Sequence, residues 1–271
     1  MRIKLVLKPL HKDSSLSLNY PYSFSSLIYR IIASSSIDYA DFLHNQGYKN
    51  GSKSFKFFTF SRPQIESQRV NNGRIYILSN SITWQIASPI KDFLENLVKG
   101  LFQQEEILLA DDGLKNYFAV TSIEKLSSPL LQDKQTFKCL APVTISITEI
   151  YNDKRQKVYV SPDKAIFSEL IRNNLIEKWR VLYGKDPENN QLDFNFDWDF
   201  INRQGGVNKV SKLICYKDIN IRGYFAPFSV SGSKELIKLG YECGFGNANS
   251  QGFGMAEIIN NKELYNARNS T

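Results

Sequence analysis

The sequence predicts an α+β fold of two tandem ferredoxin-like (RRM-like) domains, each with the element order βαββαβ. Three observations support this prediction. The chain has 271 residues, a length that suits about two domains. Strand-like alternation and helix-like periodicity follow one another in the same order in each half of the chain. Apolar residues make up 42% of the sequence and aromatic residues 13%, which is enough for two packed cores.

In the first half, apolar residues spaced along one helix face predict a helical region at 24–44. A run of serines at 34–36 is expected to interrupt it, because serine competes for backbone hydrogen bonds. Ser35 and Asp38 resemble a capping box, which predicts a second short helix at 37–43. Alternation and turn residues predict the other elements: a strand at 2–8, a strand at 56–60, two short strands within 74–87, a helix from 88 to 101 and a strand at 117–126.

The second half repeats this order of elements without a visible sequence repeat. Its predicted strands lie at 137–150, at 192–198, once or twice within 209–228, and at 253–259, and its predicted helices lie at 163–183 and 232–239. A polar stretch at 127–135 separates the two halves. The expected domains are therefore 1–127 and 136–260.

The charge balance indicates an anionic partner. Lys and Arg number 34 against 27 Asp and Glu, so the net charge is +7, which favours nucleic acid. No apolar run is long enough to span a bilayer, and Cys139, Cys215 and Cys243 lie too far apart for a Cys-x-x-Cys motif. We therefore expect a reduced, cytoplasmic protein that does not bind a membrane.

The most specific pattern is a glycine-rich segment at 244–254, between a predicted helix and a predicted strand. It matches neither the dinucleotide fingerprint nor the P-loop, because the spacing and the order of elements differ. Two interpretations stay open from the residues alone. In one, exposed backbone N–H groups bind phosphate with help from Asn247, Asn249 and Ser250. In the other, the segment is a long structural turn that Phe245 and Phe253 anchor in the core.

Several segments of the chain share one resemblance. The C-terminal ones are 221–224, 232–242 and the end of the glycine-rich segment at 249–255, and the N-terminal ones are Leu18-Asn-Tyr20, Ser26-Leu-Ile-Tyr-Arg30, Phe42-Leu-His44 and Phe57-Phe-Thr-Phe-Ser61. Together they resemble the CRISPR-associated endoribonucleases that process precursor CRISPR RNA, in the superfamily of repeat-associated mysterious proteins. The resemblance implies two ferredoxin-like domains and metal-independent cleavage within CRISPR repeat RNA, so neither a metal nor another cofactor is expected.

The chain has two histidines, His11 and His44. His11 is expected in a solvated loop, and a lone histidine is more often structural than catalytic, although its ordinary pKa suits proton transfer. The resemblance implies catalytic roles for Tyr29, His44 and Lys56, with Lys53 as the alternative lysine. Without the resemblance, the tyrosine is an ordinary helix residue and each lysine is a solvated surface charge.

The implied reaction is an attack by a 2′-hydroxyl on the adjacent phosphate, which leaves 2′,3′-cyclic phosphate and 5′-hydroxyl ends. In one unbroken helix, Tyr29 and His44 would stand about 22 Å apart along the axis. The break predicted at the serine run allows the chain to fold them toward each other.

The RNA-binding surface is expected on the second domain. The candidates are Lys209, Lys217, Arg222, Gly244, Gly246, Asn249, Ser250, Gly252 and Gly254, with Lys154, Arg155, Lys157 and Lys212 as further basic residues. Lys209 and Lys217 are eight residues apart and are expected to share one face of a strand. The alternative for each basic residue is a solvating charge.

The expected partners are CRISPR repeat RNA and subunits of a CRISPR effector complex, and the sequence leaves monomer and homodimer open. The main alternative function is a non-catalytic RNA-binding subunit of such a complex, which has no need of Tyr29, His44 and Lys56. A general RNA-recognition-motif module is less consistent, because the sequence has no Lys/Arg-Gly-Phe-Gly-Phe-like strand motif.

Overall fold

The computed structural model describes residues 1–51, 53–111, 113–151 and 154–259. The chain forms two compact units. Unit 1 comprises Met1–Pro129 together with two later segments, Ile214–Asn220 and Asn249–Gly252. Unit 2 comprises Leu130–Leu213, Ile221–Ala248 and the described residues from Phe253 on. Two short pieces of the C-terminal half therefore belong to the unit that the N-terminal half builds.

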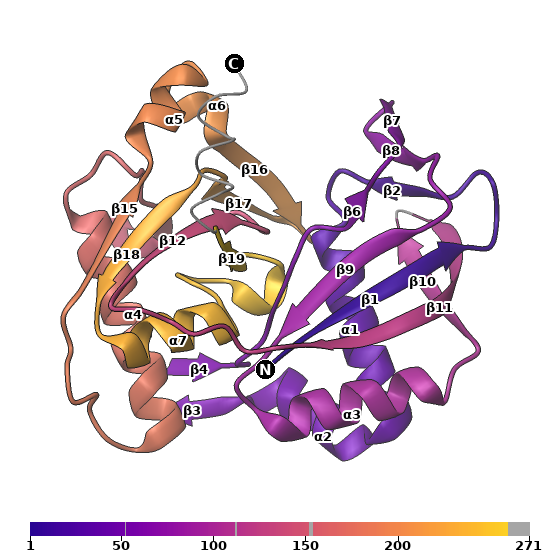
Figure 1. The fold of residues 1–271 in the computed structure, drawn as a ribbon, viewed down its shortest axis with the longest axis horizontal. Coiled ribbons are helices and arrows are strands. Elements are labelled where there is room, and N and C mark those ends of the chain that lie inside the picture. Colours follow the sequence, from indigo (N-terminus) through magenta and orange to yellow (C-terminus); the bar gives the residue numbers. More distant parts are fainter. Residues whose placement is uncertain (52, 112, 152–153, 260–271) are drawn as a thin grey trace. The chain divides into compact units, whose positions relative to one another are not determined.

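The main sheet of unit 1 has the strand order β10-β11-β1-β9-β5. Its strands are β1 (Arg2–Pro9), β5 (Thr59–Phe60), β9 (Ile82–Ala87), β10 (Glu106–Asp111) and β11 (Leu114–Leu126), and β6 (Gln64–Ile65) also pairs with β9. The central strand β1 is antiparallel to both β11 and β9. The helices α1 (Pro21–Ser35) and α3 (Lys91–Phe102) lie along the sheet (Figure 1) and connect its strands in the order β1-α1-β5-β9-α3-β11. This is the ferredoxin-like βαββαβ arrangement.

The core of unit 1 lies between this sheet and its two helices. Leu5, Phe24, Ile28 and Trp84 are among its fully buried side chains. A glycine, Gly100, lets the helices approach, because a Cβ atom there would stand 1.8 Å from the backbone oxygen of Ile31. Helix α3 therefore tolerates a residue that costs about 1 kcal/mol relative to alanine in a helix interior.

The remaining elements of unit 1 are short. Helix α2 (Ile37–Asp41) runs into a π-helical turn, η1 (Phe42–Gln46), and the hairpin of β3 (Tyr48–Asn50) and β4 (Lys53–Phe55) follows. A second sheet has the order β2-β8-β7, formed by β2 (Ser15–Ser17), β7 (Gln68–Asn71) and β8 (Arg74–Ile77).

Unit 2 repeats the plan with the strand order β15-β18-β12-β19. Its strands are β12 (Lys134–Cys139), β15 (Leu192–Phe196), β18 (Phe228–Gly232) and β19 (Ala256–Ile258), and its helices are α4 (Ile166–Tyr183) and α7 (Lys234–Cys243). The central strand β12 is antiparallel to β18 and β19, as β1 is to its neighbours. The predicted pair of ferredoxin-like domains is confirmed.

The C-terminal half of the chain also carries additions to this plan. They are the hairpin of β13 (Ser146–Tyr151) and β14 (Lys154–Tyr159), the helices α5 (Trp198–Arg203) and α6 (Val207–Val210), the hairpin of β16 (Ser211–Tyr216) and β17 (Ile219–Tyr224), and the 3-10 turn η2 (Asn249–Gln251). The tip of the β16-β17 hairpin and η2 are the segments that belong to unit 1.

Several predicted boundaries were wrong. The strand predicted at 137–150 is two strands, β12 and β13, and the strand predicted at 56–60 is ordered as a ladder only at β5. Strands β10 and β14 and helices α5 and α6 were not predicted. Strand β14 reads Lys-Arg-Gln-Lys-Val-Tyr and is largely exposed, so it lacks the apolar alternation that marks a half-buried strand. The cap of α2 is Ser36 rather than Ser35, because the Ser36 hydroxyl accepts the Tyr39 N–H at 3.2 Å.

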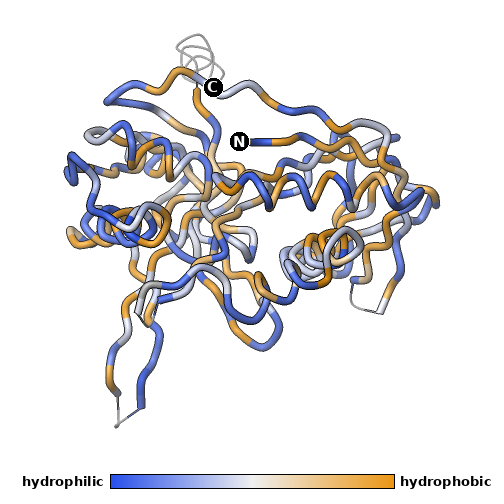
Figure 2. Tube along the Cα trace, turned by 90° about the horizontal axis from the view of Figure 1, so that it is seen from below, coloured by the Kyte–Doolittle hydropathy of each residue, from blue (hydrophilic) through white to orange (hydrophobic). Residues whose placement is uncertain are grey.

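The distribution of apolar residues shows whether any helix could cross a membrane. Figure 2 shows apolar residues interspersed with hydrophilic ones along the chain. Among the helices of the described residues, none combines the length and the hydropathy that a bilayer crossing requires.

Candidate active site

The break after α1 brings His44 back beside Tyr29. Ser36 begins α2, and the π-helical turn that follows ends at Gly47, whose φ is +65°. The rings of Tyr29 and His44 meet edge to face with their centroids 5.3 Å apart. Single π-helical turns are frequent at functional sites, because they redirect a few side chains without ending the helix.

Tyr29 is half-buried in the wall of this site. Its ring packs edge-on against Phe58, with the centroids 5.9 Å apart. Desolvation by burial raises the pKa of the Tyr29 phenol well above its ordinary value of 10.0, and the neighbouring Tyr216 raises it further. The phenol therefore keeps its proton at neutral pH and acts as a hydrogen-bond donor.

Lys56 completes a set of three side chains. Its ammonium group donates a hydrogen bond of 2.9 Å to the backbone oxygen of His44. Burial lowers the pKa of this lysine, and the nearby Lys49 lowers it further. An ammonium carries three protons, so this bond engages one of its donors. The alternative lysine, Lys53, lies opposite Asn50 at the turn end of the β3-β4 hairpin.

Gly47 makes room for this lysine. A Cβ atom at Gly47 would stand 2.8 Å from the Phe55 oxygen and 2.9 Å from the Lys56 Cδ atom. Gly47 was not singled out from the sequence. The signal that could have identified it is its place directly after the last turn of a helix, where a glycine commonly marks a helix end with positive φ.

The imidazole of His44 is exposed to solvent. Its Nδ1 atom lies 3.0 Å from the Asn45 Oδ1 atom. An amide oxygen only accepts hydrogen bonds, so this contact favours a proton on Nδ1 and leaves Nε2 as the acceptor in the neutral ring. His11 lies elsewhere, with its ring edge-on to Tyr117 at a centroid distance of 5.8 Å. The structure thus gathers a phenol, an imidazole and an ammonium group, the side chains for acid–base chemistry beside a developing negative charge.

Backbone hydrogen bonds hold the glycine-rich segment in place. The N–H groups of Gly244, Phe245, Asn247, Gly252 and Gly254 all donate to backbone oxygens of the protein. These five N–H groups therefore already have hydrogen-bond partners within the protein. Phosphate binding at this segment would have to use its other N–H groups and its side chains.

Two glycines of this segment, Gly244 and Gly246, hold a buried lysine of unit 2. The Lys178 ammonium donates to the Gly244 oxygen at 2.8 Å and to the Gly246 oxygen at 2.9 Å. Gly246 has a φ of +78°, and a Cβ atom on it would stand 2.2 Å from the Thr144 oxygen. Steric demand alone accounts for glycine at this position.

The end of the glycine-rich segment packs on α1 within unit 1. The Ser25 hydroxyl donates to the Ser250 oxygen at 2.9 Å. A Cβ atom on Gly252 would stand 2.8 Å from the Phe60 ring and 3.2 Å from Pro21. Asn249, Ser250 and Gln251 are half-buried in this place. The segment therefore supports the first turns of the helix that carries Tyr29.

The predicted basic residues occupy different elements. The expectation that Lys209 and Lys217 share a strand face was wrong, because Lys209 lies on α6 and Lys217 at the tip of the β16-β17 hairpin. Arg222 lies on β17 and donates to the Ser211 hydroxyl at 2.9 Å. Four further basic residues are exposed on strands: Lys154, Arg155, Lys157 and Lys212. Within the described parts of the chain, no group of three His, Cys, Asp or Glu side chains is arranged to hold a metal ion.

Comparisons with known proteins agree with this architecture. Residues 15–123 match the family described as CRISPR-associated protein Cas6, N-terminal, and residues 125–258 match CRISPR associated protein Cas6, C-terminal. The CRISPR-associated endoribonuclease Cas6 1 of Methanocaldococcus jannaschii is 30% identical over 272 residues, covering 100% of this chain and 98% of the relative. An endoribonuclease-like Cas6 protein of Pyrococcus furiosus is 29% identical, covering 96% and 99%.

The solved structure of a Cas6-related protein from Pyrococcus furiosus superposes with a TM-score of 0.82 at 27% identity, covering 96% of this chain and 99% of that one. The chain thus falls in the class of proteins built from two ferredoxin-like units, as the sequence predicted, with a glycine-rich segment before the last strand. Within that class, the chain belongs to the CRISPR-associated Cas6 family.

Proposed function

We propose that this chain is a metal-independent endoribonuclease that cleaves CRISPR repeat RNA within a precursor transcript. The observation that carries the proposal is the meeting of Tyr29, His44 and Lys56, three side chains that RNA binding alone does not require. The Methanocaldococcus relative, alike over its full length, is named as an endoribonuclease.

The reaction is a transesterification at one phosphodiester. The 2′-oxygen before the scissile phosphate forms a bond to phosphorus, and the bond from phosphorus to the 5′-oxygen breaks. The proton of the 2′-hydroxyl passes to solvent water, the protonated imidazole of His44 gives a proton to the departing 5′-oxygen, and the imidazole is then reprotonated from solvent. The products carry a 2′,3′-cyclic phosphate and a 5′-hydroxyl. The nucleophile belongs to the RNA, so the reaction requires no metal-bound hydroxide.

Each of the three side chains has one role. The Tyr29 phenol stays protonated and orients the 2′-hydroxyl by donating a hydrogen bond. His44 is exposed and transfers a proton, protonating the departing 5′-oxygen. Lys56 provides a positive charge next to His44 for the growing charge on the phosphoryl oxygens, which is the role of donors fixed in place before the reaction.

Binding rests on the positive charge of the chain. The net charge of +7 favours a polyanion, and Lys209, Lys217 and Arg222 are proposed to contact phosphates. At the glycine-rich segment, Asn249 and Ser250 supply side-chain donors, while Gly244, Gly246, Gly252 and Gly254 allow its backbone path. Effector-complex subunits are the partners proposed to receive the processed RNA.

A cleavage assay tests the enzymatic proposal. A labelled transcript carrying the CRISPR repeat of the source genome is incubated in EDTA with wild type, His44→Ala or His11→Ala. Wild type and His11→Ala should cut, and His44→Ala should lose about 10²–10⁴-fold in single-turnover rate. A transcript with 2′-deoxyribose at the cleavage position should bind and stay whole. Binding without any cut by the wild type would instead establish the non-catalytic RNA-binding subunit, and a cut of the deoxy transcript would refute the mechanism.

A further inference from the structure

A second aromatic side chain lies on the same face of α1 as Tyr29. Tyr22 precedes Tyr29 by seven residues, which is two helical turns and about 10 Å along the axis. Tyr22 is 40% exposed. Ser25 lies between the two tyrosines along the helix. The helix therefore carries aromatic and hydroxyl groups in a row that leads to the catalytic set.

The tip of the β16-β17 hairpin lies on this row within unit 1. The Tyr216 ring meets the Tyr22 ring edge to face at a centroid distance of 5.3 Å. The Lys217 ammonium stands over the Tyr22 ring, 5.3 Å from its centroid. Tyr216 is also one of the groups that raise the pKa of Tyr29, so it lies near the catalytic set as well as against Tyr22.

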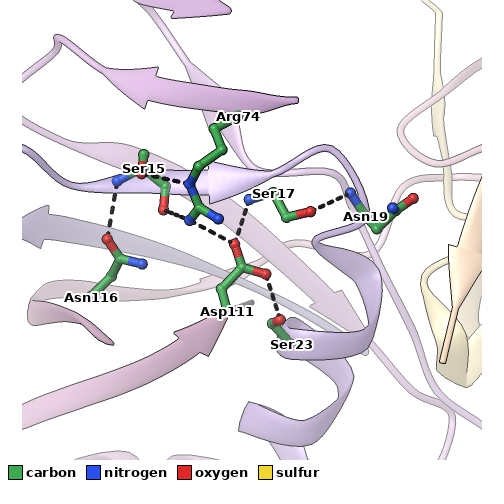
Figure 3. A network of polar contacts seen from close by, with 7 residues as sticks. All are labelled: Ser15, Ser17, Asn19, Ser23, Arg74, Asp111 and Asn116. Carbon is green, nitrogen blue, oxygen red and sulfur yellow. Dashed lines mark hydrogen bonds and ion pairs between the residues drawn. The ribbon is translucent and has the colours of Figure 1, made fainter. Parts of the chain in front are cut away.

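A polar network holds this hairpin tip against α1, and Figure 3 shows the part of the network around Asp111. The Asn19 Oδ1 atom accepts the backbone N–H of Cys215 at 3.0 Å, and the Asn19 N–H donates to the Ser17 hydroxyl at 3.1 Å. The Ser17 N–H in turn donates to the buried carboxylate of Asp111, which Ser23 also contacts at 2.8 Å. Both the hairpin tip and the start of α1 are tied to one buried carboxylate.

That carboxylate is itself paired. Arg74 contacts Asp111 at 3.2 Å and donates to the hydroxyl and the backbone oxygen of Ser15, each at 3.0 Å. The Asp111 side chain is 2% exposed. Breaking a buried ion pair leaves an uncompensated charge, which strongly disfavours rearrangement of the groups around it. The row on α1 and the hairpin tip are therefore held in place before any ligand arrives.

Lys217 adopts a backbone conformation that lysine rarely takes. Its φ is +54°, in a two-residue hairpin turn where glycine, asparagine or aspartate is the usual residue. Its backbone oxygen accepts the thiol of Cys215. The turn thus keeps an exposed ammonium over an exposed aromatic ring, although a smaller residue would form the turn at lower cost.

We propose that Tyr22, Tyr216 and Lys217 form a nucleotide subsite for single-stranded RNA beside the cleavage centre. An unpaired base stacks on Tyr22, Tyr216 supports that ring from its edge, and Lys217 moves from the ring to the adjacent phosphate. Aromatic rings and basic side chains in one place are the usual means of holding single-stranded nucleic acid. This subsite rests on the proposed function, because it is defined by its distance from the cleavage centre.

The distance sets where the base should lie. About 10 Å separates Tyr22 from Tyr29 along α1, and stacked nucleotides are spaced about 3.4 Å apart. The stacked base should therefore lie within about three nucleotides of the scissile phosphate. An abasic substitution at that one nucleotide removes the base while keeping the sugar and the phosphate.

The test is a double-mutant cycle that combines substitutions in the protein with abasic substitutions in the RNA. Dissociation constants are measured for the repeat RNA with 2′-deoxyribose at the cleavage position, so that binding is read without cleavage. Abasic sites are placed one at a time at the three nucleotides on each side. Tyr22→Ala should weaken binding about 5- to 150-fold, the range expected for the loss of one stacked base, and Tyr22→Phe should restore it.

One abasic position should weaken the wild type by the same factor and have no further effect in Tyr22→Ala. Lys217→Ala should reduce the slope of log affinity against log salt by about 0.7, the value for one phosphate contact on a single strand. Tyr183→Ala, of similar exposure at 48%, and Lys99→Ala, with the same charge change, are the controls and should behave as wild type.

Two results would overturn the subsite. In one, the loss of affinity from Tyr22→Ala and the loss from an abasic site add up at every abasic position. In the other, Tyr22→Ala binds the RNA as tightly as Tyr183→Ala does. These results are separate from the cleavage test, which uses RNA with its 2′-hydroxyl intact. Tight binding without any cleavage, together with a non-additive abasic position, would keep the subsite and reject the nuclease. Cleavage together with additive losses of affinity at every abasic position would keep the nuclease and reject the subsite.

Discussion

The ammonium group of Lys56 lies 2.9 Å from the backbone oxygen of His44, so the lysine that precedes Phe57 and Phe58 is held against the turn that carries the imidazole. The same histidine meets Tyr29 edge to face at 5.3 Å. Helix α1, the π-helical turn and the start of the segment leading into β5 thus each contribute one functional group. Proximity of this kind is what acid–base catalysis at a phosphodiester requires.

The two candidate lysines should differ sharply. Lys56→Ala removes a charge held next to His44 and should lower the single-turnover cleavage rate about 10²–10³-fold, as removal of a transition-state donor does. Lys53→Ala, three residues away at the turn end of β4, should change that rate by less than about threefold, because an exposed charge contributes little. Equal losses in the two variants would contradict the assignment of Lys56.

The raised pKa of Tyr29 has a consequence for pH dependence. Since burial raises this pKa above its ordinary 10.0, the phenol stays protonated between about pH 6 and 9. Tyr29→Phe should therefore lower the rate by a similar factor, about tenfold or more, at every pH in that range. The measurement is the single-turnover rate across the range for both proteins. A basic limb present only in wild type would show that Tyr29 ionises during the reaction.

Lys178 should make stability depend on pH. Burial lowers the pKa of its ammonium to about 8 from 10.5, against a smaller effect of Cys243 in the other direction. The unfolded chain then binds this proton more tightly than the folded one, so the free energy of unfolding rises as the pH increases from about 8 toward 10.5. The gain is lost again as the pH falls from 10.5 to about 8.

Cys243 contributes with the opposite sign, because burial raises its pKa to about 11 from 9.0 and Glu242 also raises it. The difference between wild type and Lys178→Met separates the two effects. Wild type should gain roughly 3 kcal/mol relative to the variant across this window, measured by urea denaturation at each pH. The two glycine oxygens that the variant leaves unsatisfied add a constant offset. A difference that does not vary with pH would contradict the prediction.

Gly252→Ala should loosen the contact between the glycine-rich segment and α1. Its φ is +84° and the new methyl group would stand 2.8 Å from Phe60. Gly73→Ala is the matched control in the same unit, since Gly73 has a φ of +73° and nothing within 4 Å of the added atom. Gly252→Ala should cost about 1–3 kcal/mol more than the control, measured by thermal unfolding. Equal costs would mean that only the backbone conformation matters.

Local patterns in the sequence predicted the larger elements because their causes are local. Strand β1 alternates, α4 shows helical periodicity and ends at Gly184 in the left-handed conformation, and β8 and β9 are the two short strands predicted within 74–87. The serine run correctly predicted the break after α1, while the cap fell one residue later, at Ser36. Strand β14 was not predicted because it is largely exposed, and a strand without a buried face shows no alternation of apolar and polar residues.

Residue types and the family resemblance nominated Tyr29, His44 and Lys56, and no property of the sequence measured the distances between them. The π-helical turn and Gly47, which set those distances, were not predicted. The subsite at Tyr22 was also beyond reach, because it depends on a hairpin almost 200 residues further along the chain.

By itself, then, the amino-acid order determined the class of fold, most of its helices and strands, its cationic character and the candidate chemical groups, because alternation, periodicity, charge and residue type are properties of short stretches. Only packing in three dimensions decided that Ser250 meets Ser25 across 225 residues, that Lys217 stands over Tyr22, and that Asp111 anchors both the start of α1 and the hairpin beside it. Such contacts follow from how apolar faces are buried and buried polar groups are paired, and no local pattern records which distant segments will satisfy those demands.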